Sequence, residues 1–302
     1  MDIKELIGRT SLLSSSLECR TITPLLMHGG DKEKRRDKEQ PASSQLRIPS
    51  IKGVIRYWFR ALETDLETMY KREVELFGGS SDNALKSRLI LTFDKQVVSK
   101  KLEKVLPHRS KSFSTYSISP DTSFTLHIKA YKKNEEYFEE LLTYVKLSLY
   151  LGGFGQRSRR GFGSIEFVDE TFSTPETWLQ NVQSLIQKVS ALPVSLKSEQ
   201  LIVNKKTTVI GHPQLQAVHI GKAHKVANDV LQNINQASHD VAKKFEGILG
   251  SHDPRYASPI IGSVKKIGKE FYPIVTEVKA KNENPRYNDA KMVFLEKVGV
   301  QL

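Results

Sequence analysis

Residues 152–164 read Gly-Gly-Phe-Gly-Gln-Arg-Ser-Arg-Arg-Gly-Phe-Gly-Ser, which places five glycines and three arginines in thirteen residues. A helix-like run (137–151) precedes this stretch, and a strand-like run (165–168) follows it. Glycine costs roughly 0.5–1 kcal/mol more than alanine to fix in one conformation, so we expect a poorly ordered loop with exposed backbone N–H groups. Arg157, Arg159 and Arg160 add planar, permanently charged groups that suit phosphate. The stretch therefore predicts contact with a polyanion.

Three other kinds of structure share features with this glycine loop. A solvated surface hairpin has the same composition. A mononucleotide site needs a third glycine after a strand, or a Lys-Ser or Lys-Thr pair that completes a P-loop, and this loop has neither. Residues 160–167 resemble the RNP1 pattern of RNA-recognition motifs in part, but Ser164 stands where that pattern has a base-stacking aromatic residue.

The overall charge also indicates a polyanionic partner. The chain has 302 residues, 38% of them hydrophobic and 26% charged, and its net charge is +12. An acidic membrane surface is the competing explanation for such a charge. No apolar run approaches the ~20 residues of a membrane-spanning helix, and no signal peptide is evident at the N-terminus. The lone Cys19 excludes an intrachain disulfide and suits a reducing compartment, so we expect a cytoplasmic protein.

A second basic feature is predicted on a helix that begins after Pro49, with Ser50 as its N-cap. Apolar residues repeat with helical spacing at Ile51, Val54, Ile55, Trp58 and Leu62. On another face, Lys52, Arg56 and Arg60 recur every four residues. Such a stripe by itself is typical of a solvated face, but beside the glycine loop it predicts an anion-binding face. Tyr57 is then the candidate for base stacking, whereas Trp58 is expected in the core.

The order of elements indicates an α+β fold. Strands are expected at 18–26, 88–98, 123–131 and 165–168, with helices after Pro49 and at 135–151, and a long hairpin or insertion at 99–121. This β-α-β-β-α-β order is the ferredoxin-like (RRM-like) arrangement. The glycine loop then joins the second helix to the fourth strand.

The second half begins near Thr174-Pro175, a predicted N-cap followed by the first helical residue. We expect a helix at 176–191, a polar connection at 192–211, a strand at 214–220, a largely helical 223–249, a hairpin of 258–267 and 270–278, and a closing helix at 287–298. These elements predict a second, divergent ferredoxin-like unit whose final strand is missing or supplied elsewhere. The predicted domains are 1–172 and 173–302.

Three stretches together resemble a known family. Residues 23–30, 47–60 and 152–163 are similar to the RAMP proteins of CRISPR systems, and most of all to the first RAMP subunit of the type III-B (Cmr) effector complex. Residues 255–259 (Arg-Tyr-Ala-Ser-Pro) also resemble a segment of that subunit. The resemblance implies two ferredoxin-like domains in an antiviral ribonucleoprotein that recognises foreign RNA with a guide. It also implies CRISPR RNA, target RNA and other RAMP subunits as partners, and a place near the 3′ end of the guide.

The resemblance and the basic features together nominate RNA-binding residues. They are His28, Gly29, Gly30, Lys52, Arg56, Tyr57, Arg60, Gly155, Arg157, Ser158, Arg159, Arg160, Gly161 and Gly163. In this family target cleavage is assigned to the backbone RAMP subunits, which implies a non-catalytic binder here.

Two alternatives stay open at this point. His28 departs from the pattern of the family, and related RAMP nucleases use a histidine as general acid or base without metal. The chain could therefore be a metal-independent endoribonuclease that uses His28. It could also be an architectural protein whose basic surface meets another subunit. No cofactor or metal site is predicted, because His219, His224 and His239 form no His-Glu-x-x-His motif or Cys/His cluster.

Overall fold

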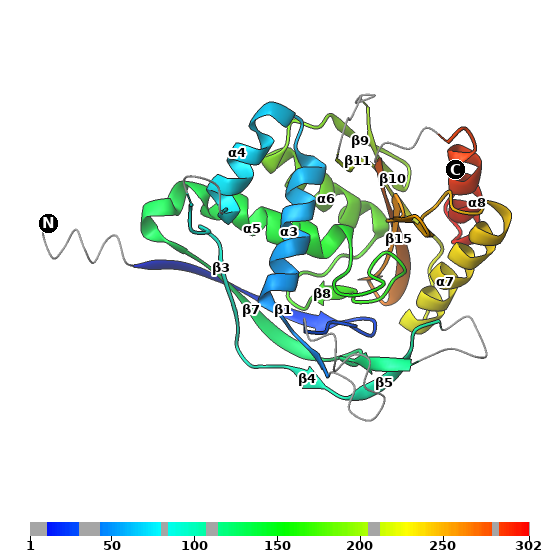
Figure 1. Cartoon of the computed structure of the whole chain (residues 1–302), viewed down its shortest axis with the longest axis horizontal. Coiled ribbons are helices and arrows are strands. Elements are labelled where there is room, and N and C mark those ends of the chain that lie inside the picture. The colour runs from blue at the N-terminus through cyan, green and yellow to red at the C-terminus, as the bar shows by residue number, and fades with distance from the viewer. Residues whose placement is uncertain are drawn as a thin grey trace, which may run out of the picture.

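The computed structural model describes residues 11–29, 43–79, 84–106, 114–204, 212–279 and 284–301. Within these residues the chain forms a mixed α+β fold with two main antiparallel sheets and helices packed on both (Figure 1). None of the described helices is long and apolar enough to cross a membrane. Gly30, one of the predicted RNA-contacting residues, lies outside the described residues.

The first sheet contains four antiparallel strands in the spatial order β3-β7-β1-β8. The strands are β1 (Leu12–Thr21), β3 (Ile90–Phe93), β7 (Ser123–Tyr131) and β8 (Ile165–Phe167). Helix α3 (Ile48–Leu62) follows β1, and α5 (Phe138–Leu151) follows β7 after the 3₁₀ turn η1 (Lys132–Tyr137). These six strands and α-helices succeed one another in the predicted β-α-β-β-α-β order.

The alternating burial along strand β7 matches the alternation of apolar and polar residues in its sequence. Phe124, Leu126 and Ile128 are buried, and the residues between them are half-buried, as expected for a strand with one face on the core. Before β7, β5 (Lys101–Lys104) and β6 (Ser114–Ser117) pair as the predicted hairpin, and β2 (Ser44–Gln45) pairs with β4 (Val98–Ser99).

The predicted start of α3 was wrong. The helix begins at Ile48, its N-cap is Arg47, and no side chain caps it. Ser50 therefore lies inside the first turn and is not the N-cap. Pro49 is accommodated there because the first turn of a helix needs no donor from its backbone nitrogen. The next helix, α4 (Leu66–Phe77), is capped by the carboxylate of Asp65.

The second sheet has five antiparallel strands in the order β14-β15-β11-β10-β9. The strands are β9 (Val194–Lys197), β10 (Gln200–Val203), β11 (Gln214–Ile220), β14 (Ile260–Ile267) and β15 (Glu270–Lys279). Helices α7 (Ala227–Lys244) and α8 (Tyr287–Lys297) lie beside it at one end of the molecule (Figure 1). A two-residue ribbon, β12 (Ser251–His252) with β13 (Arg255–Tyr256), precedes β14.

The prediction that residues 192–211 form a polar connection was wrong for its first part. Strands β9 and β10 form a hairpin there, which turns at Ser198 with a φ of +52°. Their alternation was hidden because each strand is only four residues long. Strand β10 pairs antiparallel with β11, on the side away from β15. The hairpin of β9 and β10 thus extends the second sheet beyond β11.

The hydrophobic core is continuous across the predicted boundary at residue 172. Helix α6 (Pro175–Val189) starts at Pro175 with Thr174 as its N-cap, as predicted, and packs against α5. One cluster of buried side chains includes Trp58 and Tyr144 from the first half and Trp178 and Val218 from the second. The two sheets are therefore joined by shared apolar packing as well as by the chain.

A buried histidine on β11 is surrounded by charged groups of the second half. Burial lowers the pKa of His219 to about 4, the carboxylate of Glu277 on β15 opposes this shift, and Lys291 on α8 adds to it. Glu277 accepts hydrogen bonds from the Tyr287 hydroxyl (2.9 Å) and the Lys291 ammonium (3.1 Å). Neither ring nitrogen of His219 has a hydrogen-bond partner among the described residues.

This histidine predicts a loss of stability in acid. The unfolded chain binds a proton at His219 near pH 6.5, whereas the folded chain resists it down to about pH 4. The free energy of unfolding should therefore fall between these values, by about 2–3 kcal/mol from this group. Urea unfolding at pH 7.5, 6, 5 and 4 should show a shallower pH dependence for His219→Leu than for the wild type. Equal slopes for the two proteins would refute the prediction.

Candidate nucleic-acid interface

The glycine loop is a packed structure and does not have the poor order that the glycines predicted. Gly155, Gly161 and Gly163 adopt φ values of +79°, +86° and +66°, and Arg157 adopts +57°. A Cβ atom on Gly163 would lie 1.9 Å from the Phe154 oxygen, and one on Gly155 would lie 2.4 Å from the Leu26 oxygen. Glycine is needed here because the loop crosses itself and the chain after β1 at backbone contact distance.

Most backbone N–H groups at the two ends of the loop donate hydrogen bonds within the protein, which corrects the expectation that they are exposed. Phe154 N donates to Gly163 O (2.9 Å), Gln156 N donates to Leu26 O (2.7 Å), and Gly163 N donates to Pro24 O (2.9 Å). The tip differs from the ends. The backbone N–H groups of residues 157, 158 and 159 donate no hydrogen bond to any described residue. We call these three residues the loop tip.

The loop lies along the edge strand of the second sheet. Gly161 N donates to Gly262 O (2.9 Å), Gly262 N donates to Arg159 O (3.1 Å), and Arg160 forms a parallel bridge with Gly262. Two residues further on, Val264 N donates to the Ser164 hydroxyl (2.9 Å). The loop therefore occupies backbone groups that an edge strand otherwise leaves unpaired.

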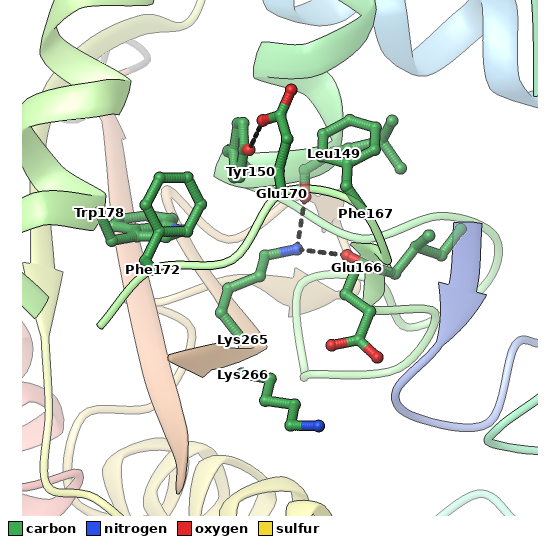
Figure 2. A pocket seen from close by; sticks show the side chains of 10 residues that line it. Leu149, Tyr150, Glu166, Phe167, Glu170, Phe172, Trp178, Lys265 and Lys266 are labelled. Atoms are coloured by element: carbon green, nitrogen blue, oxygen red, sulfur yellow. Dashed lines mark hydrogen bonds between the residues drawn. The ribbon is translucent and has the colours of Figure 1, made fainter. Parts of the chain in front are cut away.

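A buried lysine reinforces this junction (Figure 2). Lys265 on β14 donates to three backbone carbonyls: Leu149 near the end of α5, Gly152 at 3.2 Å and Ile165 at 3.3 Å. Burial lowers the pKa of Lys265 to about 7, while only the protonated amine has three hydrogens for three acceptors. Lys265 thus provides donors for the carbonyls at the end of α5, which a helix leaves without partners.

The three arginines of the loop all reach the second half. Arg157 donates to the Asn235 side-chain oxygen on α7 (3.0 Å), Arg159 donates to the Ser258 carbonyl, and Arg160 donates to the Leu249 carbonyl (3.2 Å). Burial, together with the charges of Arg157 and Arg159, lowers the pKa of Arg160 to about 10. Arg160 is therefore a half-buried side chain that is hydrogen-bonded to the second half, and its surroundings disfavour its charge.

Arg159 also connects the loop to α3. Its guanidinium carbon lies 5.2 Å from the centroid of the Tyr57 ring, in the geometry of a cation–π contact. The neighbouring Trp58 is buried against Gly152 in the core, as predicted. The structure thus brings Tyr57 and Arg159 together, and both are predicted to contact RNA.

The basic stripe of α3 is partly neutralised within the fold. Arg56 and Arg60 both donate to the buried carboxylate of Glu73 on α4, at 2.6–2.7 Å. Lys52 donates to the Leu89 carbonyl (2.7 Å), and burial and then the charge of Arg56 lower its pKa. The side chains of Arg56 and Arg60 remain 33% and 42% exposed. Contact of these two arginines with RNA stays a prediction, and Glu73 partly balances the charge of this helix face.

His28 and Gly29 lie in the segment after β1, which the loop contacts two residues earlier at Leu26. His28 is only 9% exposed, and its Nδ1 lies 3.4 Å from the Ser43 carbonyl. Arg47 at the start of α3 donates to the His28 carbonyl (3.0 Å). The structure therefore places His28 near the loop and α3 but in a buried setting. Among the described residues, no group of three His, Cys, Asp or Glu residues could hold a metal ion.

Sequence reasoning did not single out Asn235 or Lys265. Asn235 accepts from Arg157 and donates to the Arg160 carbonyl (2.9 Å), so it fixes the loop from α7. The available signal was its position: Asn235 follows Leu231 by four residues and lies on the buried side of the helix. Lys265 is buried in a strand that is exposed only at Lys266, and a buried lysine requires partners inside the protein.

The comparisons with known proteins agree with this geometry. Residues 18–166 match the model of the RAMP superfamily, and the resemblance inferred from the sequence is confirmed. The chain is similar to the CRISPR system Cmr subunit Cmr1-2 of Pyrococcus furiosus, with 25% identity over 188 residues, covering 49% of this chain and 92% of the relative.

Two solved structures share the fold over nearly the whole chain. The crystal structure of apo Cmr1 from Pyrococcus furiosus has a TM-score of 0.57 at 18% identity and covers 96% of this chain and 98% of its own. A chain in a cryo-EM structure of the type III-B Cmr-beta complex bound to cognate target RNA has a TM-score of 0.56 at 13% identity and covers 95% and 100%. At such identities the likeness concerns the fold.

The packing of the loop predicts that Gly163→Ala is destabilising. The added Cβ would meet a backbone oxygen at 1.9 Å, and the φ of +66° is unfavourable for alanine. We expect a loss of about 1–3 kcal/mol in the free energy of unfolding, measured by chemical denaturation. Gly53→Ala is the matched control, because Gly53 lies in α3 with nothing within 4 Å of the added Cβ. That variant should gain about 0.5–1 kcal/mol, and equal effects of the two substitutions would contradict the packed loop.

Proposed function

We propose that this chain is a non-catalytic RNA-binding subunit of a type III-B CRISPR ribonucleoprotein effector complex. It holds guide RNA, target RNA or both near the 3′ end of the guide, in antiviral defence. Its partners are CRISPR RNA, target RNA and other RAMP subunits, and it works in the cytoplasm without membrane attachment. The match to the RAMP superfamily model and the likeness to Cmr1 support this proposal.

One observation of the structure carries the RNA-binding part. The loop tip offers three successive backbone N–H groups without partners among the described residues, and it carries two arginines and a serine hydroxyl. Successive free amides form an anion-binding concavity, and arginine adds charge that suits phosphate. Phosphate contacts position a strand without reading its sequence, as a subunit that serves many guides requires.

The proposal includes the domain organisation. The first sheet and its helices form one ferredoxin-like unit at 1–172, and the second sheet forms another at 173–302. In support, the order β3-β7-β1-β8 is that of a β-α-β-β-α-β sandwich, and β14-β15-β11 has the same order with three strands. In the second unit, β10 takes the place and direction of the fourth strand.

We further propose that His28 has no role in catalysis. Its ring is buried, Arg47 donates to the His28 carbonyl, and Arg56 is bound to the carboxylate of Glu73. A general acid or base must come within hydrogen-bond reach of the reacting atoms, and a ring with 9% exposure is poorly placed for this.

The loop tip predicts a specific charge effect on RNA binding. Ser158→Asp adds a carboxylate beside the free amides, and we expect it to lower the affinity for a labelled single-stranded RNA by about tenfold or more at low salt. Ser158→Asn is its neutral, nearly isosteric control and should bind within about twofold of the wild type. Fluorescence anisotropy over a range of salt concentrations measures both. For the wild type, four to six neutralised phosphates give a slope of about −3 to −4 in log affinity against log salt.

Ser158→Asp is a better test than Arg160→Ala, because loss of the Arg160 side chain would also remove its hydrogen bond to the Leu249 carbonyl in the second half. An equal affinity of Ser158→Asp and Ser158→Asn would show that the tip does not meet phosphate. A wild-type slope near zero would show that binding is not electrostatic.

The absence of catalysis predicts intact RNA. After long incubation of the wild-type chain with end-labelled single-stranded RNA, with divalent cations or with a chelator, a denaturing gel should show full-length RNA only. His28→Ala should give the same gel. Cleavage by the wild type that persists in chelator and disappears with His28→Ala would instead establish the metal-independent endoribonuclease.

A further inference from the structure

The loop arginines position a second exposed element beside the loop tip. Arg159 donates to the Ser258 carbonyl and Arg160 donates to the Leu249 carbonyl, and these two carbonyls flank residues 250–257. The ends of this segment also meet each other, because a Cβ on Gly250 would lie 3.1 Å from Ser258 N. Strands β12 and β13 form a two-residue ribbon between these ends, which we call the anchored hairpin.

The anchoring is necessary for the hairpin to have a defined structure. A two-stranded ribbon is marginally stable alone even when it is long, and this one pairs only Ser251 with Tyr256 and His252 with Arg255. The guanidinium groups of the loop therefore serve as its base. Because their N–H groups bond to these carbonyls, part of the hydrogen-bonding capacity expected to meet phosphate is already used.

The exposed side chains of the anchored hairpin combine an aromatic ring with a cation. Residues 253–257 are exposed, and Tyr256 is 40% exposed. Arg255 forms no ion pair with any described residue. Phe245 precedes the hairpin in the chain, and Lys244 and Arg286 lie over its ring, at 5.3 and 4.8 Å from the centroid. Neither of these two cations forms an ion pair with a described residue.

We propose that the anchored hairpin is an RNA-contacting element in which the Tyr256 ring stacks on an unpaired nucleobase and Arg255 binds an adjacent phosphate. This inference rests on the proposed function and deepens it, because it assigns the second half of the chain a direct role. The ligand class is single-stranded RNA. Stacking on an aromatic ring tolerates any base, and a nearby cation follows the backbone.

Stacking and charge are separated by their salt dependence. Tyr256→Ala removes a neutral ring, and we expect it to lower the affinity for single-stranded RNA by about ten- to a hundredfold while the salt slope stays unchanged. Arg255→Ala removes one cation, and it should make the slope shallower by about 0.7. Tyr256→Phe keeps the ring and should bind within about twofold of the wild type.

The experiment uses the full chain, anisotropy of labelled RNA, and a second RNA with 2-aminopurine at successive positions. Stacking on Tyr256 should change the 2-aminopurine fluorescence at one position, and Tyr256→Ala should abolish that change. Tyr131→Ala is the matched control, because Tyr131 is 41% exposed at the end of β7, and it should bind as the wild type does. Duplex RNA should bind Tyr256→Ala and wild type equally, since its bases are already stacked.

Each result has a defined meaning. RNA binding by the wild type that Tyr256→Ala lowers no more than Tyr131→Ala overturns this inference and leaves the proposed function standing. Equal losses in Tyr256→Phe and Tyr256→Ala exclude stacking as the contact. A wild-type chain that binds no RNA overturns both the proposed function and this inference. Thermal unfolding of each variant should match that of the wild type, because both substituted side chains are exposed.

Discussion

The pairing of the glycine loop with the edge strand β14 is the contact on which the candidate interface depends. It joins residues 159–161 to Gly262 by backbone hydrogen bonds, and Lys265 adds three bonds from the same strand to the carbonyls around the loop. An edge strand is prone to pair with other chains, and here the protein covers part of that edge with its own loop. The same contact fixes where the loop arginines can point, because both flanks of the loop are held.

Electrostatics then divides the basic residues into two groups. Arg56 and Arg60 share the carboxylate of Glu73, so these cations stabilise the packing of α3 on α4 as well as contributing charge. Arg160 has no carboxylate partner among described residues, and its neighbours are other arginines. Like charges this close together are unfavourable in isolation, and an anion beside them would relieve that repulsion. The net charge of +12 alone could not make this distinction.

Several parts of the fold could be predicted from the sequence because local patterns determine them. The alternation in β7, the hairpin that turns after Ile267, and the cap at Thr174 each depend on residues within one element. The hairpin of β9 and β10 was missed because strands of four residues carry little periodicity. The order of the glycine loop was missed for a different reason: its partners, Leu26 and Gly262, are distant in the sequence. Composition predicts the intrinsic freedom of a loop, whereas long-range contacts decide whether that freedom is used.

The candidate site, too, could be predicted from the sequence only where local patterns determine it. The arginines, Tyr57 and the glycines were identifiable from residue type and spacing, but their roles depend on what each guanidinium already binds. Because the flanks of the loop are hydrogen-bonded to the chain after β1 and to β14, the loop tip is preorganised. Binding a phosphate there therefore costs little ordering entropy in the loop. The loop arginines, whose guanidinium groups are bonded to the second half, are then more effective as a charged, rigid support than as flexible arms. A loop that is rich in glycine can therefore be a rigid binding element, because its glycines permit close backbone packing.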